Sequence, residues 1–491
     1  MKFKYQYSML RSMSYIELLG SIILFLIITI PTVSCKKLVE VDVPITSLTS
    51  LNTYNNDGTA TSVLTGIFGS MGSGEVYTGS SGISLRCGLS ADELVLWNGG
   101  FNGGANQQLY QNNLSARLPI APDYWQDYYK KLLTINSAIE GLEASNTLTK
   151  AVQKQLLGES LFLRAFFHFY LISFFGDIPL VLASDWRVNA IAARTPKEEV
   201  YQQIIEDLKH AYDLLNGKYV KSDALSTYDI GSEERVRPTK WAAAALLARI
   251  YLYAGDWGNA EIQATNLINH NSLFGLNTLD QAFEKNNKEA IWQIQYVNSD
   301  RNTEGFHFIL TENPGFNRPT YLSNFLMNAF DAADERKSKW IGSYSNGTTT
   351  YYYPFKYKAQ IDPNNSEYLM VLRLAEQYLI RAEARAQQNK INEAQGDLDV
   401  IRSRAGLLNT TANEKSSLLA AILHERQVEL FTEWGHRWFD LKRTGTLNTV
   451  MSIVYPTKKM GGTWNSDWQL YPLPETQIVL NPNLAPNNPG Y

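Results

Sequence analysis

The chain has 491 residues, a formal net charge of −4 and a sequence pI near 6.0. This balance leaves no basic surplus to neutralise phosphates, so the sequence argues against a nucleic-acid partner. Charged residues make up only 19% of the chain while aromatic residues reach 12%. Such a composition suits a surface that binds uncharged, hydroxyl-rich ligands.

The first predicted segment is a secretory signal that ends at a lipidation site. An apolar run at residues 18–30 follows a basic N-terminus, and Pro31-Thr32-Val33-Ser34 then leads into Cys35. About 13 apolar residues fit a signal peptide and fall short of the roughly 20 that span a bilayer. We expect cleavage before Cys35 and acylation of its thiol, with an uncleaved membrane anchor as the alternative.

Cysteine usage agrees with this interpretation. The chain has two cysteines, so acylation of Cys35 leaves Cys87 without a partner and no internal disulfide is expected. Without a disulfide, the exported chain must be held together by a hydrophobic core, and it is long enough to form one.

The composition changes along the chain in a way that predicts three segments. These are a signal peptide at 1–34, the lipidated cysteine and a tether at 35–58, and a single domain at 59–491. We expect the domain to comprise a loop-rich N-terminal part at 59–120, helical repeats at 121–271 and 366–445, a mixed insertion at 272–365, and a coil tail at 446–491.

Long amphipathic helices dominate the predicted domain. Helical spacing of apolar residues predicts helices at 124–142, 151–174, 196–215, 238–254, 257–269, 368–388, 391–405 and 418–441. Strands are predicted at 290–297 and 348–357. Small residues such as Ala248 and Ala260, beside Leu247 and Trp257, favour closely packed helix hairpins of the tetratricopeptide type. An ordinary helical bundle is the alternative.

Four ordered motifs in the chain carry a family resemblance. They are RAFFHFY at 164–170 with FGDIPL at 175–180, RLAEQYLIRAEA at 373–384, ERQVELFTEWGHRWFDLKR at 425–443, and YPLP at 471–474 with NPGY at 488–491. Together they resemble the SusD/RagB family of outer-membrane lipoproteins. The first two are similar to two of the family's repeats, the third to its C-terminal hallmark and the fourth to its closing motif.

The resemblance implies a mainly α fold, with a tetratricopeptide-like helix-hairpin scaffold, long loop-rich insertions and a few short strands. It also implies a nutrient-binding protein that is lipid-anchored on the outer membrane and faces the cell exterior. The implied partners are an oligosaccharide and a SusC-like TonB-dependent transporter barrel.

The hallmark segment carries acidic residues that invite a catalytic interpretation. Glu425, Glu429 and Glu433 recur every four residues, so they share one helix face, and adjacent turns can supply the roughly 5 Å between two carboxylates that flank a sugar. Basic residues, among them Arg426 and Arg437, interleave with these acids and favour a structural ion-pair network instead. We therefore predict no catalytic residues.

Metal and nucleophile chemistry receive no support from the sequence. The six histidines are scattered without the spacing of metal ligands, and no nucleophile elbow or phosphate-binding loop is present. We predict no metal and no cofactor, and we interpret Cys87 as a small core residue.

Aromatic residues in predicted loops are the best candidates for ligand contacts. Trp97 lies in a Gly- and Asn-rich loop, where a flat ring can stack on a sugar and neighbouring amides can bond its hydroxyls. A Trp that only pins its own loop is the alternative. The predicted ligand-binding residues are Trp97, Asn98, Phe101, Asn102, Tyr296 and Arg373.

The main hypothesis is a non-enzymatic glycan-binding lipoprotein that delivers oligosaccharides to a transporter. A peptide-binding uptake protein of the RagB type is the first alternative, and it should use strand edges and charged pockets. A surface glycoside hydrolase is the second alternative.

Overall fold

The computed structural model describes residues 53–73, 76–79, 82–97, 104–117, 120–297 and 300–491. The segment Ser50–Tyr491 forms one compact unit. The predicted signal peptide and Cys35 lie outside the described residues, and so does most of the predicted tether, so cleavage and acylation stay predictions.

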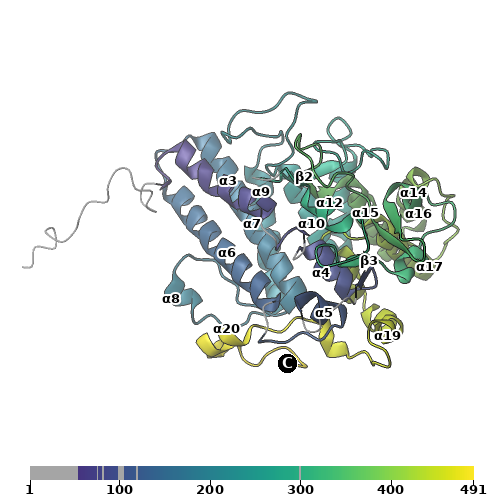
Figure 1. The fold of residues 1–491 in the computed structure, drawn as a ribbon. Coiled ribbons are helices and arrows are strands. Elements are labelled where there is room, and N and C mark those ends of the chain that lie inside the picture. Colours follow the sequence, from purple (N-terminus) through teal and green to yellow (C-terminus); the bar gives the residue numbers. More distant parts are fainter. Residues whose placement is uncertain (1–52, 74–75, 80–81, 98–103, 118–119, 298–299) are drawn as a thin grey trace, which may run out of the picture. The chain divides into compact units, whose positions relative to one another are not determined.

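Successive helices form the scaffold (Figure 1). They are α6 Ile120–Ala144, α7 Lys150–Phe175, α9 Lys197–Leu214, α10 Lys240–Ala254, α11 Trp257–Ile268, α15 Leu374–Gln387, α16 Ile391–Arg404 and α17 Lys415–Glu429. In this order each helix packs against the next, as in stacked helix hairpins. The mainly α fold predicted from the sequence is confirmed.

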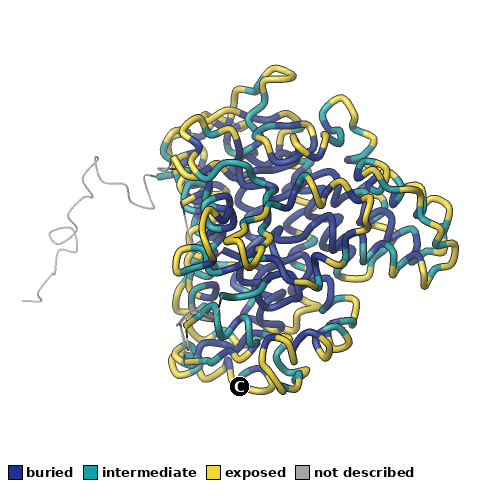
Figure 2. Tube along the Cα trace, turned by 45° about the vertical axis from the view of Figure 1, so that its right-hand side comes forward, coloured by how far each residue is buried: buried dark blue, intermediate teal, exposed yellow. Residues whose placement is uncertain are grey.

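The central helix of the scaffold is α7. Among the described residues it alone is long and apolar enough to cross a membrane, but 94% of its most apolar stretch is buried inside the protein. Figure 2 shows the buried interior surrounded by exposed loops. The composition of α7 therefore reflects a place in the core.

The hairpin of α10 and α11 shows how small residues bring helices together. Ala248 on α10 and Ala260 on α11 are fully buried, which lets the two backbones approach closely. Gly255 ends α10 with a φ of +77°, a conformation that glycine adopts without steric cost. Asp256 then caps α11 by accepting the Asn259 N–H at 3.1 Å.

The structure corrects the start of the helix predicted at 368–388. Its first residues form strand β6 (Leu369–Arg373), which pairs antiparallel with β2 (Ala290–Ile294), and helix α15 begins only at Leu374. Every residue of both strands is buried. A short, continuous apolar run does not distinguish a buried strand from a buried helix, which explains the wrong boundary.

The helix predicted at 418–441 is two helices. Helix α17 ends at Glu429, and α18 (His436–Arg443) follows after a break. Thr432, Trp434 and Gly435 have φ values of 51°, 47° and 74°, which no α-helix accommodates. The Trp434 indole donates to the Met370 carbonyl at 2.7 Å, so packing fixes the break.

Three two-stranded antiparallel sheets lie in the described part of the chain. Besides β2 and β6, β1 (Leu94–Leu96) pairs with β3 (Thr320–Leu322), and β4 (Ile341–Ser345) pairs with β5 (Thr350–Pro354). Strands β3 and β5 contact each other. The β1–β3 pair therefore links the N-terminal part of the domain to the insertion.

Further helices, most of them short, occupy segments that the sequence predicts as loop or coil. In the N-terminal part these are α3 Asp57–Ser73, α4 Ile83–Ser90 and α5 Ala105–Tyr110. The insertion and the connections hold α8 Trp186–Asn189, α12 Thr303–Phe308, α13 Asn324–Met327 and α14 Glu335–Lys339. The tail holds α19 Leu447–Lys458, η3 Ser466–Gln469, α20 Glu475–Leu480 and η4 Pro482–Leu484.

Buried arginine–carboxylate pairs join the scaffold helices to one another. Arg164 on α7 binds both oxygens of Asp207 on α9, at 2.8 and 2.7 Å. Arg249 on α10 binds both oxygens of Glu376 on α15, each at 2.7 Å. A guanidinium held by two parallel bonds fixes the orientation of both helices, because the bonds require coplanar partners.

Candidate functional site

Trp97 is fixed by a continuation of the β1–β3 ladder. Val95 pairs with Tyr321 and Leu96 with Thr320, and the Trp97 N–H then donates to the Pro319 carbonyl at 2.6 Å. The Trp97 side chain is half-buried, so part of its surface reaches solvent. Its backbone is therefore held by a strand partner 222 residues away in the sequence.

Other aromatic side chains gather on the same side of this ladder. Side chains alternate along a strand, so Val95, Trp97 and the opposed Tyr321 share one face. The rings of Tyr321 and Tyr351 meet edge to face, with centroids 5.1 Å apart. Burial and, secondarily, the nearby Tyr321 raise the pKa of Tyr110 to about 12. We call Trp97, Tyr110, Tyr321 and Tyr351 the aromatic face.

Two acidic residues just before β1 attach the aromatic face to the hallmark segment. Asp92 accepts both prongs of Arg437, at 2.8 and 2.7 Å, and the Glu93 carboxyl accepts the Thr432 N–H at 3.1 Å. Burial, followed by the neighbouring Asp92, raises the pKa of Glu93 to about 8. Since both side chains are buried, they hold β1 in place and are not ligands.

The structure describes three of the six predicted ligand-binding residues, Trp97, Tyr296 and Arg373. Trp97 lies on the aromatic face, whereas Asn98, Phe101 and Asn102 lie outside the described residues. Tyr296 is buried in the hydrophobic core.

Arg373 is 2% exposed, which leaves its side chain out of reach of a ligand. Glu376, three residues later on α15, is at helical spacing for a pair with Arg373 but binds Arg249. The Arg373 guanidinium instead contacts Glu289 at 2.9 Å, Glu429 at 2.5 Å and Glu433 at 2.8 Å.

The acidic residues of the hallmark segment belong to a buried ion-pair network. Its members are Glu289, Asp334, Arg336, Lys356, Arg373, Arg402, Arg404, Glu425, Glu429 and Glu433. Burial alone would raise the pKa of Glu429, but Arg404, Arg373 and Arg336 together hold it well below its ordinary value. Arg336 also binds Glu425 at 2.7 Å.

This network has the properties of a structural element. Glu425 and Glu429 are fully buried, and each carboxylate is shared between two or more cations. A glycosidase needs one protonated and one ionised carboxyl open to the sugar. The arrangement of these glutamates therefore offers no acid and base pair to a substrate, in agreement with the interpretation from the sequence.

Nothing in the described residues suggests a metal centre. No group of three or more His, Cys, Asp or Glu among them is arranged to hold an ion. The chemistry that the aromatic face can perform is stacking and hydrogen bonding.

Sequence reasoning missed three members of the aromatic face. Tyr321 belongs to a strand of only three residues, too short for a periodicity signal. Tyr110 ends a short helix inside the segment expected to be loop-rich. Tyr351 was detectable, because the run Tyr351-Tyr352-Tyr353 lies in the strand predicted at 348–357, where aromatic residues are enriched.

Comparisons with known proteins give a consistent result. Residues 330–491 match the sequence profile described as the SusD family, and residues 98–252 match one described as starch-binding and associating with the outer membrane. A SusD-like protein, P2, of Formosa agariphila is 28% identical over 424 residues, which cover 75% of this chain and 80% of that protein.

Solved structures agree on the fold. A SusD superfamily protein from Bacteroides vulgatus superimposes with a TM-score of 0.76 at 22% identity, over 89% of this chain and 100% of the other. A laminarin-binding SusD-like protein superimposes with a TM-score of 0.72 at 22% identity, again over 89% and 100% of the two chains.

Proposed function

We propose, from the premise that this chain belongs to the SusD family, that it captures oligosaccharides at the aromatic face and passes them to a TonB-dependent outer-membrane transporter. In this proposal the protein is a binder and not an enzyme. Binding needs exposed rings and hydrogen-bonding groups, whereas hydrolysis needs a pair of accessible carboxyl groups.

The observation that carries the proposal is the position of Trp97. Its backbone is fixed by the bond to Pro319, and Tyr321 and Tyr351 stand on the same side of the ladder. A sugar ring presents an apolar C–H face that stacks on such rings. A preorganised platform binds more tightly than a mobile one, because less conformational entropy is lost on binding.

The proposed location is the outer face of the outer membrane, anchored through acylated Cys35. Two observations support it: the apolar run that ends at Cys35, and the match of residues 98–252 to a profile described as associating with the outer membrane. An anchored receptor next to a barrel delivers its ligand over a short distance, so the effective concentration of the ligand at the transporter is high.

The test is calorimetric titration of protein lacking residues 1–35. Laminarin oligosaccharides are the first probe, because one structural neighbour is described as laminarin-binding, and a glycan array extends the search. Trp97→Ala should weaken binding by at least about tenfold, or about 1.4 kcal/mol, through loss of stacking area. Trp186→Ala is the matched control, since Trp186 is 71% exposed on α8, away from the aromatic face.

Three outcomes would count against the proposal. Undiminished affinity in folded Trp97→Ala would move the ligand away from the aromatic face. Release of new reducing ends from a polysaccharide would favour the hydrolase. Binding of peptides without any glycan binding would favour the peptide-uptake alternative.

A further inference from the structure

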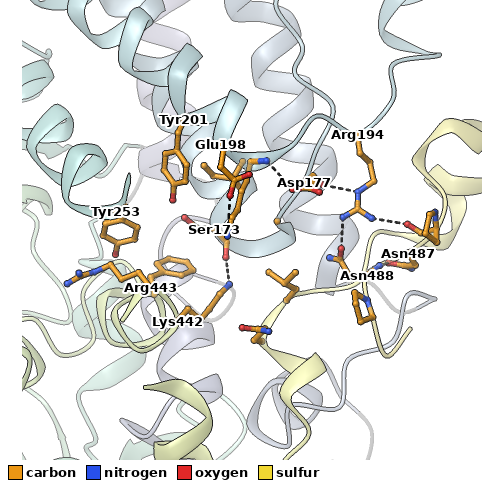
Figure 3. A pocket seen from close by; sticks show the side chains of 18 of the residues that line it. Ser173, Asp177, Arg194, Glu198, Tyr201, Tyr253, Lys442, Arg443, Asn487 and Asn488 are labelled. Carbon is orange, nitrogen blue, oxygen red and sulfur yellow. Dashed lines mark hydrogen bonds and ion pairs between the residues drawn. The ribbon is translucent and has the colours of Figure 1, made fainter. Parts of the chain in front are cut away.

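A cavity of about 960 Å³ lies between the scaffold and the C-terminal segment, apart from the residues of the aromatic face. The end of α7, the first turns of α9, the end of α10 and helix α18 form its walls, and residues 469–489 close another side. Figure 3 shows Lys442 and Tyr253 on one side and Arg194 with Asn487 and Asn488 on the other. Its volume is in the upper range of small-molecule sites.

Lys442, which lines this cavity, is half-buried and differs from the buried Lys356 and Lys458 in its hydrogen bonding. Lys356 donates to two carbonyls and to the Glu433 carboxylate, and Lys458 donates to three carbonyls. All three N–H groups of each ammonium are thereby satisfied. Lys442 makes one bond, to the Ser173 carbonyl at 2.5 Å.

The positive charge of Lys442 also lacks a counter-ion. Among the described residues no carboxylate forms an ion pair with it. Burial lowers its pKa to about 7, and a nearby anion would reverse that shift. An ammonium group that has unused N–H donors, no ion-pair partner and a cavity beside it is suited to bind an anion.

Other cations reinforce the charge of the cavity. Arg194 donates to the carbonyls of Asp177 and Pro486 and to the amide oxygen of Asn488, and it forms no ion pair among the described residues, although the Asp177 carboxylate acts on it through space. Lys197 contacts Glu198 only at 3.9 Å. A small anion entering here meets more positive than negative charge.

The remaining walls suit a hydroxylated ring. The half-buried Tyr201 and Tyr253 supply aromatic surface, and Asp177 and Glu198 are exposed carboxylates that can accept hydrogen bonds from hydroxyl groups. A cavity that combines a cation, hydrogen-bond acceptors and aromatic rings suits an acidic sugar better than it suits a simple inorganic anion.

We propose that this cavity is a second ligand site that binds the carboxylate of an acidic saccharide, with Lys442 as its counter-ion. The choice of a saccharide rests on the proposed function, whereas the preference for an anion rests on the cavity alone. Lys442 thus acts as a specificity determinant separate from Trp97.

The test uses the full chain in detergent, titrated at pH 6 and low ionic strength. The probes are trisaccharides of galacturonate, glucuronate and mannuronate, each beside its carboxyl-reduced neutral counterpart. We expect at least one acidic trisaccharide to bind tenfold or more tightly than its neutral counterpart. Lys442→Met should abolish that preference. Lys459→Met is the control, because it removes the same charge from an exposed position outside the cavity.

Folding does not confound this test, because methionine keeps the length of the side chain and removes a half-buried charge that has no ion-pair partner among the described residues, so the melting temperature should not fall. The proposal is overturned if no acidic trisaccharide binds, if the neutral counterparts bind equally, or if Lys442→Met binds as the wild type does. Equal binding of triglutamate would overturn the saccharide assignment. If Trp97→Ala no longer binds the acidic trisaccharide, that ligand lies on the aromatic face and not in the cavity. If acidic trisaccharides bind but no neutral glycan does, the result counts only against the proposed function.

Discussion

Glu429 is the carboxylate on which three arginines converge inside the core. Its oxygens contact Arg336 at 3.0 Å and Arg373 at 2.5 Å, and also bind Arg404. An isolated charge at this depth would be costly, and it is tolerated because Glu429 belongs to the network described above, in which carboxylates and cations are equal in number. The chemistry of this residue is therefore determined by its neighbours and not by its place in a motif.

Glu429→Ala should be strongly destabilising. The substitution leaves arginine charges buried without their partner, which costs on the order of 3 to 5 kcal/mol. Thermal and urea unfolding measure the loss, and Glu393→Ala, at an exposed helix position, is the control that should change little. Oligosaccharide affinity below the melting transition should stay at the wild-type value. A variant of normal stability would contradict the structural role of the network.

The buried carboxyl group of Glu304 should make the free energy of unfolding depend on pH. It is buried on α12 and accepts the Thr78 hydroxyl at 3.0 Å, and burial raises its pKa from 4.5 to about 7. The folded state therefore holds a proton that the unfolded state releases between pH 4.5 and 7. The contribution of Glu304 to the free energy of unfolding is fully present below pH 4.5 and is lost as the pH rises through about 7. The loss is on the order of 3 kcal/mol.

Glu304→Gln tests this dependence, because glutamine keeps the shape and cannot ionise. We expect the wild type to lose stability relative to the variant between pH 4.5 and 8, as measured by urea unfolding at each pH. Parallel pH profiles for the two proteins would show that Glu304 does not take up the proton.

At the scale of elements, the break between α17 and α18 determines where residues 432–437 of the hallmark segment lie. The turn between them brings the Thr432 N–H to the Glu93 carboxyl and Arg437, on α18, to Asp92, and these contacts anchor β1 beneath the aromatic face. A continuous helix would carry residues 432–437 in another direction. The break is thus a requirement of the site.

Gly435→Ala should destabilise the protein more than Gly445→Ala. Both glycines have positive φ, 74° and 71°, so both variants pay a backbone cost of about 1 to 2 kcal/mol. A Cβ at Gly435 would also lie 2.8 Å from the Cys87 sulfur, whereas at Gly445 nothing lies within 4 Å. The extra cost at Gly435 should be about 1 to 3 kcal/mol in unfolding experiments. Equal destabilisation of the two variants would show that the contact with Cys87 relaxes freely.

The helices of the scaffold were predictable because apolar periodicity is a local property of the sequence. The prediction at 151–174, for example, differs from α7 by one residue at each end. Strand β6 was not predictable, because its identity depends on β2, about 80 residues earlier, and an apolar run alone fits a helix equally well.

The candidate site was predictable only in part, for a related reason. Trp97 could be selected from its polar neighbours, but the burial of Tyr296 and Arg373 depends on tertiary contacts that composition does not encode. Arg373 looked available as a ligand donor because three of its partners, Glu289, Glu429 and Glu433, are distant in the sequence.

At the scale of the whole molecule, the described residues form a hydrophobic core of their own. Residues from Tyr54, just before α3, to the tail, including Met71, Phe167 and Leu473, belong to one continuous hydrophobic cluster. A domain with its own core can be attached to a membrane by a lipid without depending on it for folding. The anchor and the domain should therefore be separable by mutation.

Cys35→Ser should abolish acylation and leave the domain folded. The only other cysteine, Cys87, is fully buried, and burial raises the pKa of its thiol, so it is a poor nucleophile for modification. Metabolic labelling with a clickable fatty acid should mark the wild type and Cys87→Ser but not Cys35→Ser. The melting temperature of Cys35→Ser should equal that of the wild type, since the described residues form a continuous hydrophobic cluster of their own. Label on Cys35→Ser would refute the lipoprotein assignment, because a chain with two cysteines offers no other plausible thiol.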